Sequence, residues 1–359
     1  MPVILVAPAA FKGTFGPRQI ADSLAVGIRK ALPDAKVLTC PVADGGDGLL
    51  EAVLPPGSLL EKVSVTGPLG APVSAELGWL DADTAIFASS SACGLALVPP
   101  DQRAPLRATT RGVGELIWEA ADRGARTVVV GLGGSATVDG GTGAGRGLGW
   151  SFTDSSGVEL PEGGGALGDL AAISGGWRLG AQVVALTDVT NPLTGPNGAA
   201  AVFGPQKGAS RSEVEQLAAG LGRLAECLDS SGHPGMDTLP GGGAAGGLGA
   251  GLAAFARASL TPGAPWVLDR IGFDAALATV DLVITGEGEF DATSFAGKVT
   301  GEIVRRAQAA RRRIAVVAGR AAAQVGITVV SGEGGTLSQT DIEGMGHRVA
   351  REALGLPAS

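Results

Sequence analysis

Residues 127–149 read TVVVGLGGSATVDGGTGAGRGLG, a short apolar, β-branched run followed by a loop in which nine of the nineteen residues from Gly131 to Gly149 are glycine. Glycine adopts positive φ angles and has no Cβ, so the backbone N–H groups of such a loop can approach a ligand closely. A buried strand that ends in a loop of this kind is typical of sites that bind phosphate. The stretch therefore predicts an α/β fold that handles phosphorylated small molecules.

The same order of an apolar run, a polar or glycine-rich loop and often a helix recurs along the chain. The predicted strands are residues 3–7, 36–40, 127–130, 183–186, 281–284, 314–318 and 327–330. These runs are continuously apolar rather than alternating, which is typical of strands that are buried on both faces of a parallel sheet. The periodicity of apolar residues predicts helices over residues 17–31, from about 110 to 124, and from about 212 to 228.

Residues 63–87 follow a different pattern, with turn residues between two alternating segments, and they predict an antiparallel hairpin. A domain boundary is therefore expected near this point. We expect two α/β domains with largely parallel sheets, the second inserted into the first, and an active-site cleft between them. Residues 1–65 and 280–359 would form a Rossmann- or flavodoxin-like domain, and residues 66–279 the inserted one.

Composition narrows the class of protein. The chain has 359 residues, of which 45% are hydrophobic and 17% charged, enough to bury a large core. Its formal net charge is −8 and it has no long basic block, so nucleic acid is not an expected partner. Three widely spaced cysteines and an N-terminal apolar run that is broken at Pro8 favour a cytoplasmic protein that is not embedded in a membrane. A monomer or a homodimer is expected.

Charged and hydroxyl side chains lie in the loops that follow the predicted strands, where open α/β sheets bind their ligands. These residues are Lys12, Asp44, Asp47, Ser135, Thr137, Asp139, Asp188, Glu287, Asp291 and Lys298. Carboxylates in such loops either hold Mg²⁺ and accept a proton, or hydrogen-bond to the backbone of their own turn. From the residues alone both interpretations stay open.

Lysine usage favours a functional interpretation. Only six of the 27 basic residues are lysines, and three of the six, Lys12, Lys207 and Lys298, each adjoin a glycine in a loop. An ammonium group is a compact charge suited to phosphate oxygens. The alternative is that all three are ordinary solvated lysines.

Several motifs together resemble the bacterial type I glycerate kinase family, and they follow one another in order over nearly the whole chain. They are FKG at residues 11–13, ADGGDG at 43–48, GGSATVDGG at 133–141, DVTNPLTG at 188–195, AVFGPQKG at 201–208, DLVITGEGEFD at 281–291 and GKV at 297–299. The resemblance implies an enzyme that uses ATP and Mg²⁺ to phosphorylate D-glycerate, usually at the 2-hydroxyl group.

The resemblance also implies roles for the residues that match. Asp188 would accept the proton of the attacking hydroxyl group, and Glu287, Asp291 and Asp188 would hold Mg²⁺. Charge on the phosphates or on the glycerate carboxylate would be neutralised by Lys12, Lys207 and Lys298. The set that binds the nucleotide would be Gly133, Gly134, Ser135, Thr137, Asp139 and Asp44.

The chain departs from the family pattern in places, with Ala9-Ala10 where Asp-Ser is common and Glu289 where Arg is common. Two further kinase functions stay open, one that forms 3-phosphoglycerate and one that acts on another hydroxy acid. Two functions of other classes also stay open. The Gly131-x-Gly133-x-x-Ala136 match, with Asp154 downstream, would suit an NAD-dependent dehydrogenase, and the same loops would suit a non-catalytic sensor of phosphorylated metabolites.

Overall fold

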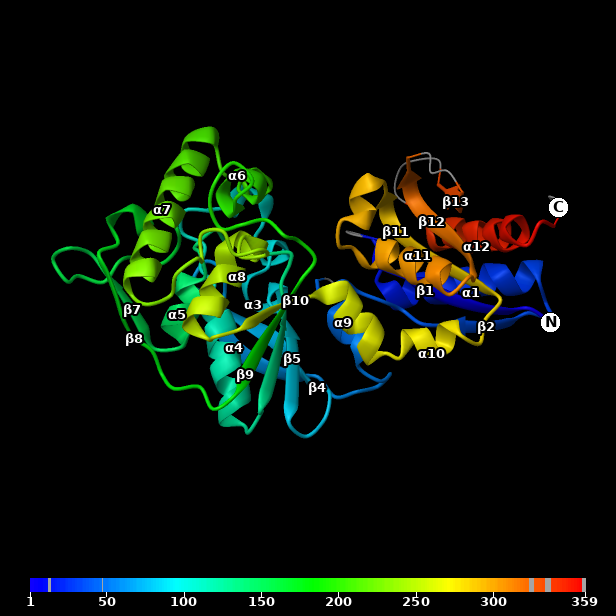
Figure 1. The fold of residues 1–359 in the computed structure, drawn as a ribbon, viewed down its shortest axis with the longest axis horizontal. Coiled ribbons are helices and arrows are strands. Elements are labelled where there is room, and N and C mark those ends of the chain that lie inside the picture. Colours follow the sequence, from blue (N-terminus) through cyan, green and yellow to red (C-terminus); the bar gives the residue numbers. More distant parts are fainter. Residues whose placement is uncertain (12–13, 47, 323–325, 333–336, 357–359) are drawn as a thin grey trace. The chain divides into compact units, whose positions relative to one another are not determined.

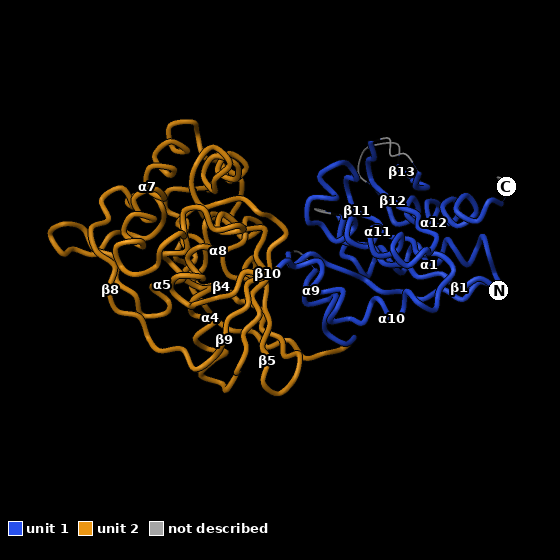
Figure 2. The backbone as a smooth tube through the Cα atoms, viewed as in Figure 1, with its two compact units in different colours: residues 1–56, 262–359 blue, residues 57–261 orange. Residues whose placement is uncertain are grey.

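The computed structural model describes residues 1–11, 14–46, 48–322, 326–332 and 337–356, so Lys12 and Asp47 lie outside the described residues. The chain divides into two compact units, residues 1–56 with 262–359 (unit 1) and residues 57–261 (unit 2), as Figure 2 shows. In the described residues, no helix combines the length and the apolar character needed to cross a membrane.

Unit 1 contains a parallel sheet with the strand order β13-β12-β11-β1-β2 (Figure 1). The strands are β1 (Val3–Pro8), β2 (Lys36–Thr39), β11 (Leu282–Phe290), β12 (Arg313–Ala321) and β13 (Thr328–Ser331). The helices are α1 (Pro17–Ala31), α2 (Leu49–Val53), α9 (Gly263–Arg270), α10 (Phe273–Leu277), α11 (Val299–Ala309) and α12 (Gln339–Ala353), with a 3₁₀ turn η5 (Ala292–Phe295).

Helices cover both faces of this sheet because both faces are apolar. On β1, Ile4 and Val6 pack in one cluster with residues of α1 and α12. Their neighbours Leu5 and Ala7 point to the opposite face and pack with residues of α9, α10 and α11. Successive side chains of a strand alternate between faces, so a continuously apolar strand is buried on both sides.

Unit 2 contains a mixed sheet with the order β10-β9-β6-β5-β4-β3, in which β5, β6 and β9 are parallel. The strands of this unit are β3 (Glu61–Thr66), β4 (Pro72–Trp79), β5 (Thr84–Ala88), β6 (Thr127–Gly131), β7 (Trp150–Thr153), β8 (Ala172–Gly175), β9 (Gln182–Thr187) and β10 (Ser259–Pro262). The helices are α3 (Ser90–Cys93), α4 (Arg111–Asp122), α5 (Thr142–Gly147), α6 (Ala199–Phe203), α7 (Arg211–Ser230) and α8 (Ala244–Phe255).

The predicted α/β class with largely parallel sheets is confirmed, as are the seven predicted strands and the three predicted helices. The hairpin expected within residues 63–87 is present as the antiparallel pair β3–β4. Residues 57–65, expected in the first domain, lie in unit 2 because β3 pairs with β4. Residues 262–279, expected in the second, lie in unit 1 because α9 and α10 pack against its sheet.

Candidate active site

A pocket of about 440 Å³ lies in unit 1, where β1 and β11 end and α11 begins. Three of the predicted site residues, Asp44, Glu287 and Lys298, line it together with Phe11 and Thr14, the described residues that flank Lys12 and Gly13. The carboxyl ends of parallel strands meet at one edge of the sheet, which is why residues so far apart in sequence share this pocket.

Glu287 and Lys298 form an ion pair in this pocket. Lys298 Nζ lies 3.3 Å from Glu287 Oε2, and Glu287 is only 7% exposed. Burial raises the pKa of the Glu287 carboxyl, while the nearby hydroxyl groups of Ser294 and Thr300 and the ammonium group of Lys298 oppose the rise. Glu287 Oε1 is buried and has no hydrogen-bond partner among the described residues. A buried carboxylate oxygen without a donor is costly unless a ligand satisfies it, so this atom is a candidate ligand for a cation.

Asp291, a predicted metal ligand, follows β11 but is not among the residues that line this pocket. Its Oδ1 accepts hydrogen bonds from the backbone N–H and the hydroxyl of Thr293, at 2.7 and 2.6 Å, and these bonds cap η5. Hydrogen bonding of the charged form lowers the pKa of the Asp291 carboxyl.

No group of three or more His, Cys, Asp or Glu side chains that could hold a metal ion occurs among the described residues. Mg²⁺ usually binds proteins through one or two carboxylates, and substrate phosphates and water complete its coordination. The pocket offers a buried glutamate oxygen and the carboxylate of Asp44, a donor set that fits this mode of binding rather than a closed protein cage.

The glycine-rich loop predicted to bind phosphate follows β6 in unit 2. Gly134 is exposed and has a φ of 60°, in the left-handed region that favours glycine. Its carbonyl accepts a hydrogen bond from Leu95 N at 2.7 Å, and Ala136 N donates to Cys93 O at 2.8 Å. These bonds anchor the loop to the segment after β5.

Asp188 follows β9, which pairs with β6 in parallel, so its loop leaves the sheet beside the glycine-rich loop. Leu132 N donates to Leu186 O at 2.8 Å. This bond continues the pairing of the two strands to the residue before Gly133 on one side and to within two residues of Asp188 on the other. The structure thus brings Asp188 to the same edge of the unit 2 sheet as Gly133, Gly134 and Ser135.

Lys207 is 3% exposed and does not lie on the surface of its loop. Its Nζ donates to Ser135 Oγ at 2.8 Å and to Thr137 O at 2.6 Å. Burial lowers the pKa of Lys207 to about 8, against the effect of Cys93 and Asp139, which raise it. In this structure the ammonium group therefore fixes the conformation of the glycine-rich loop.

Asp139 is fully buried and is satisfied by the protein itself. Its carboxylate accepts hydrogen bonds from Thr110 N, Thr110 Oγ1, Gly141 N and Gly143 N, at 2.8 to 3.2 Å. Burial raises the pKa of this carboxyl, and the four hydrogen bonds oppose the rise. These hydrogen bonds connect Asp139 to the start of α4 and to the start of α5, and they fix the conformation of the glycine-rich loop.

The pocket of unit 1 contains residues that the sequence did not indicate, among them Thr300 and Arg320. Arg320 lies opposite Glu289 in the parallel register of β11 and β12. The sequence did not indicate that Arg320 and Glu289 are neighbours, because strand pairing rather than sequence spacing places the two side by side. Asp154, on which a dehydrogenase interpretation depends, instead accepts hydrogen bonds from Ser156 N and Val158 N in its own turn.

The sequence is similar to known proteins over most of its length. The sequence profile of the glycerate kinase family matches residues 4–344. The chain belongs to the glycerate kinase family. It is 40% identical over 330 residues to glycerate 2-kinase of Escherichia coli (strain K12), covering 90% of this chain and 87% of that protein. It is 41% identical over 312 residues to glycerate kinase of Bacillus subtilis (strain 168), covering 85% of this chain and 81% of the relative.

The fold also matches a solved member of the glycerate kinase family. A crystal structure assigned as glycerate kinase 2 from Salmonella typhimurium LT2 superimposes with a TM-score of 0.82 and 37% sequence identity, over 99% of this chain and 98% of that one. The resemblance noted in the sequence is confirmed, and the chain is an enzyme of the phosphotransferase class that glycerate kinases represent.

Proposed function

We propose that the enzyme transfers the γ-phosphoryl group of ATP to the 2-hydroxyl group of D-glycerate, forming 2-phosphoglycerate. The name of the Escherichia coli relative, glycerate 2-kinase, supports this position of transfer. The observation that carries the proposal is the buried Glu287–Lys298 pair at the end of β11, with one glutamate oxygen lacking a donor among the described residues. The alternative is transfer to the 3-hydroxyl group, which would form 3-phosphoglycerate.

Glu287 would hold Mg²⁺, with Asp291 and Asp188 as the further ligands that the sequence predicts, directly or through water. Bound Mg²⁺ would neutralise charge on the phosphate oxygens. Asp291 Oδ1 is engaged by Thr293, which favours a water-mediated role for this residue. Asp44 lines the same pocket and would bind the nucleotide, as the sequence predicts.

Lys298, together with Lys12, would neutralise phosphate oxygens or the glycerate carboxylate. The N–H groups of Gly133, Gly134 and Ser135 would bind phosphate from the glycine-rich loop. In phosphoryl transfer, positioning and neutralisation of charge supply nearly all of the rate acceleration.

For Lys207, Thr137 and Asp139 the geometry supports a positioning role. Lys207 is buried and donates to Ser135 and Thr137, and Asp139 has four donors of its own. A side chain committed in this way holds the phosphate-binding loop in shape, rather than contacting phosphate itself.

Asp188 would accept the proton of the attacking hydroxyl group. Replacing Asp188 with asparagine keeps the shape of the side chain and removes the base, so kcat should fall about 10²-fold while ATP binding survives. A coupled assay of ADP release with D-glycerate and MgATP measures kcat, and nucleotide titration measures binding.

Asp122→Asn, on the exposed surface of α4, is the matched control and should retain the kcat of the unaltered enzyme. If Asp188→Asn also retains it, Asp188 is not the base.

A further inference from the structure

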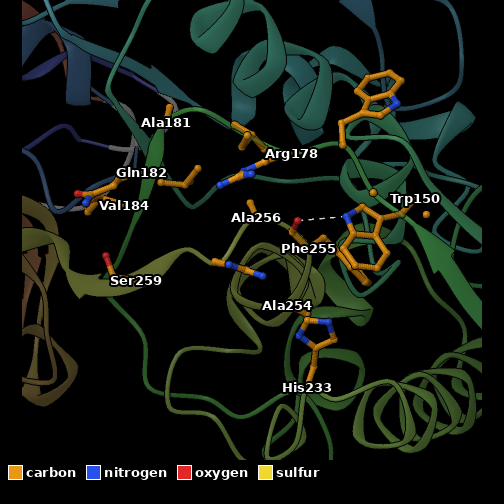
Figure 3. Close-up of a pocket in the computed structure, with 16 residues that line it drawn as sticks. Trp150, Arg178, Ala181, Gln182, Val184, His233, Ala254, Phe255, Ala256 and Ser259 are labelled. Carbon is orange, nitrogen blue, oxygen red and sulfur yellow. Dashed lines mark hydrogen bonds between the residues drawn. The ribbon is translucent and has the colours of Figure 1, made fainter.

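A second and larger cavity, of about 910 Å³, lies within unit 2 and takes no part in the proposed reaction (Figure 3). In Figure 3 Gln182 and Ser259 lie on its left, Trp150 on its right, Arg178 above and His233 below. Its volume is within the range of sites for small organic ligands. The residues come from the β7–β8 hairpin, the loop before β9, the start of β9, the loop after α7, the end of α8 and the start of β10.

Two indole rings give this cavity walls that are already formed. A Cβ on Gly176 would lie 2.5 Å from the ring of Trp150, and a Cβ on Gly149 would lie 2.5 Å from the ring of Trp177. Each ring therefore lies directly on the backbone of a glycine, and any other residue would push it away. Trp150 Nε1 also donates to Phe255 O at 3.1 Å, which fixes the orientation of the ring. Trp177 is 52% exposed, and its ring also contacts that of Trp118, with the ring centroids 4.6 Å apart.

The charge of the lining is positive in an acidic protein. Arg178 and Arg257 line the cavity, and the described residues that line it include no Asp or Glu. Neither arginine has an ion pair or a hydrogen bond with any other residue that the structure describes. Nine other arginines in the described part of the chain have an ion pair with a carboxylate, as Arg146 does with Glu159 and Arg306 with Glu302.

Arg257 occupies a position where a glycine would be expected. It follows the C-cap residue Ala256 of α8 and has a φ of 53°, in the left-handed region that glycine adopts most easily. The partial negative charge at the end of α8 favours a cation there, but this does not explain Arg178, which lies in the loop between β8 and β9. A ligand that both guanidinium groups contact would account for the two together.

The cavity is separate from the proposed catalytic loops. It is lined by Gln182, Val183 and Val184, at the amino end of β9, whereas Asp188 follows the carboxyl end of that strand. A strand of six residues spans about 20 Å. A ligand in the cavity would therefore bind at the opposite edge of the unit 2 sheet from Asp188.

We propose that this cavity is a second ligand site, specific for an organic anion that carries a planar ring, of which a nucleoside monophosphate is the representative. The guanidinium groups of Arg178 and Arg257 form charge-assisted hydrogen bonds with the phosphate. The planar ring packs on the exposed face of Trp177 or on Trp150. Binding here leaves the loops that carry the phosphotransferase chemistry free.

The test is calorimetric titration with AMP of the intact enzyme and of the double variant Arg178→Ala/Arg257→Ala. The double variant should bind AMP at least 10-fold more weakly and keep the kcat of the unaltered enzyme. Trp177→Ala should weaken AMP binding but not the weak binding of inorganic phosphate. The matched control is Arg126→Ala/Arg211→Ala, which removes two exposed arginines of unit 2, 83% and 95% exposed, and should bind AMP normally.

Equal affinity of the intact enzyme and the Arg178→Ala/Arg257→Ala variant for AMP would overturn the proposal, as would the absence of AMP binding at millimolar concentration. Loss of AMP binding in Lys298→Met but not in the double variant would place AMP at the catalytic site and overturn it too. If inorganic phosphate bound as tightly as AMP, the indole rings would contribute nothing to affinity, and the proposal of a site for a ring-bearing anion would also be overturned.

Discussion

Replacing Lys298 with methionine is expected to lower kcat/KM for ATP by about 10³-fold, the upper range for loss of one charged donor to a phosphoryl transfer. The reason is that two functions are lost together. The variant lacks the cation itself, and Glu287, which is buried 3.3 Å away, loses the partner that opposes the rise of its pKa. A glutamate that becomes protonated no longer binds Mg²⁺. Initial rates of ADP release at varied ATP concentration measure the effect.

Lys30→Met is the control for this experiment. Lys30 is an exposed lysine of the same unit that pairs with Glu343, with Nζ 2.6 Å from Oε2, so its loss removes a lysine without touching the pocket. An exposed pair of this kind contributes at most about 1 kcal/mol to stability. A kcat/KM of Lys298→Met within about threefold of the Lys30→Met value would remove Lys298 from the reaction.

Replacing Asp139 with alanine is expected to lower the free energy of unfolding of unit 2 by about 3–5 kcal/mol, as is typical when one partner of a buried charged network is removed. Four donors from Thr110, Gly141 and Gly143 would be left in the interior without an acceptor. Urea denaturation followed by tryptophan fluorescence measures the change, because four of the five tryptophans, all except Trp266, lie in unit 2.

Asp154→Ala serves as the control, since Asp154 also accepts two backbone hydrogen bonds in unit 2 but at the surface. Its loss should cost less than about 1 kcal/mol. Equal destabilisation by the two substitutions would show that Asp139 does not support the glycine-rich loop more than an ordinary turn residue supports its turn.

The strands were predictable because a strand that is buried on both faces must be apolar at every position, as Ile4, Leu5 and Val6 are. The grouping of Asp44, Glu287 and Lys298 was predictable for a related reason, since loops after parallel strands share one edge of the sheet.

The environment of single side chains was not predictable. Lys207 adjoins a glycine as Lys298 does, yet one is buried and the other is partly exposed. The burial of Lys207 depends on Ser135 and Thr137, which are 72 and 70 residues away along the chain. The conformation of α8 was not predictable from the sequence either. Ala245, Gly246 and Gly247 have positive φ angles within a segment that otherwise forms a helix. The cavity lined by Trp150, Arg178 and Arg257 has no sequence motif, since four separate segments of the chain supply its lining.

Phosphorus NMR of the product formed from D-glycerate and MgATP tests the central claim most directly. A phosphate on the 2-hydroxyl group couples to the single proton on carbon 2, so the account predicts a new resonance that is a doublet in the proton-coupled spectrum. A triplet, from coupling to the two protons on carbon 3, would contradict the proposed position of transfer, and the absence of any new ester resonance would contradict the proposed reaction.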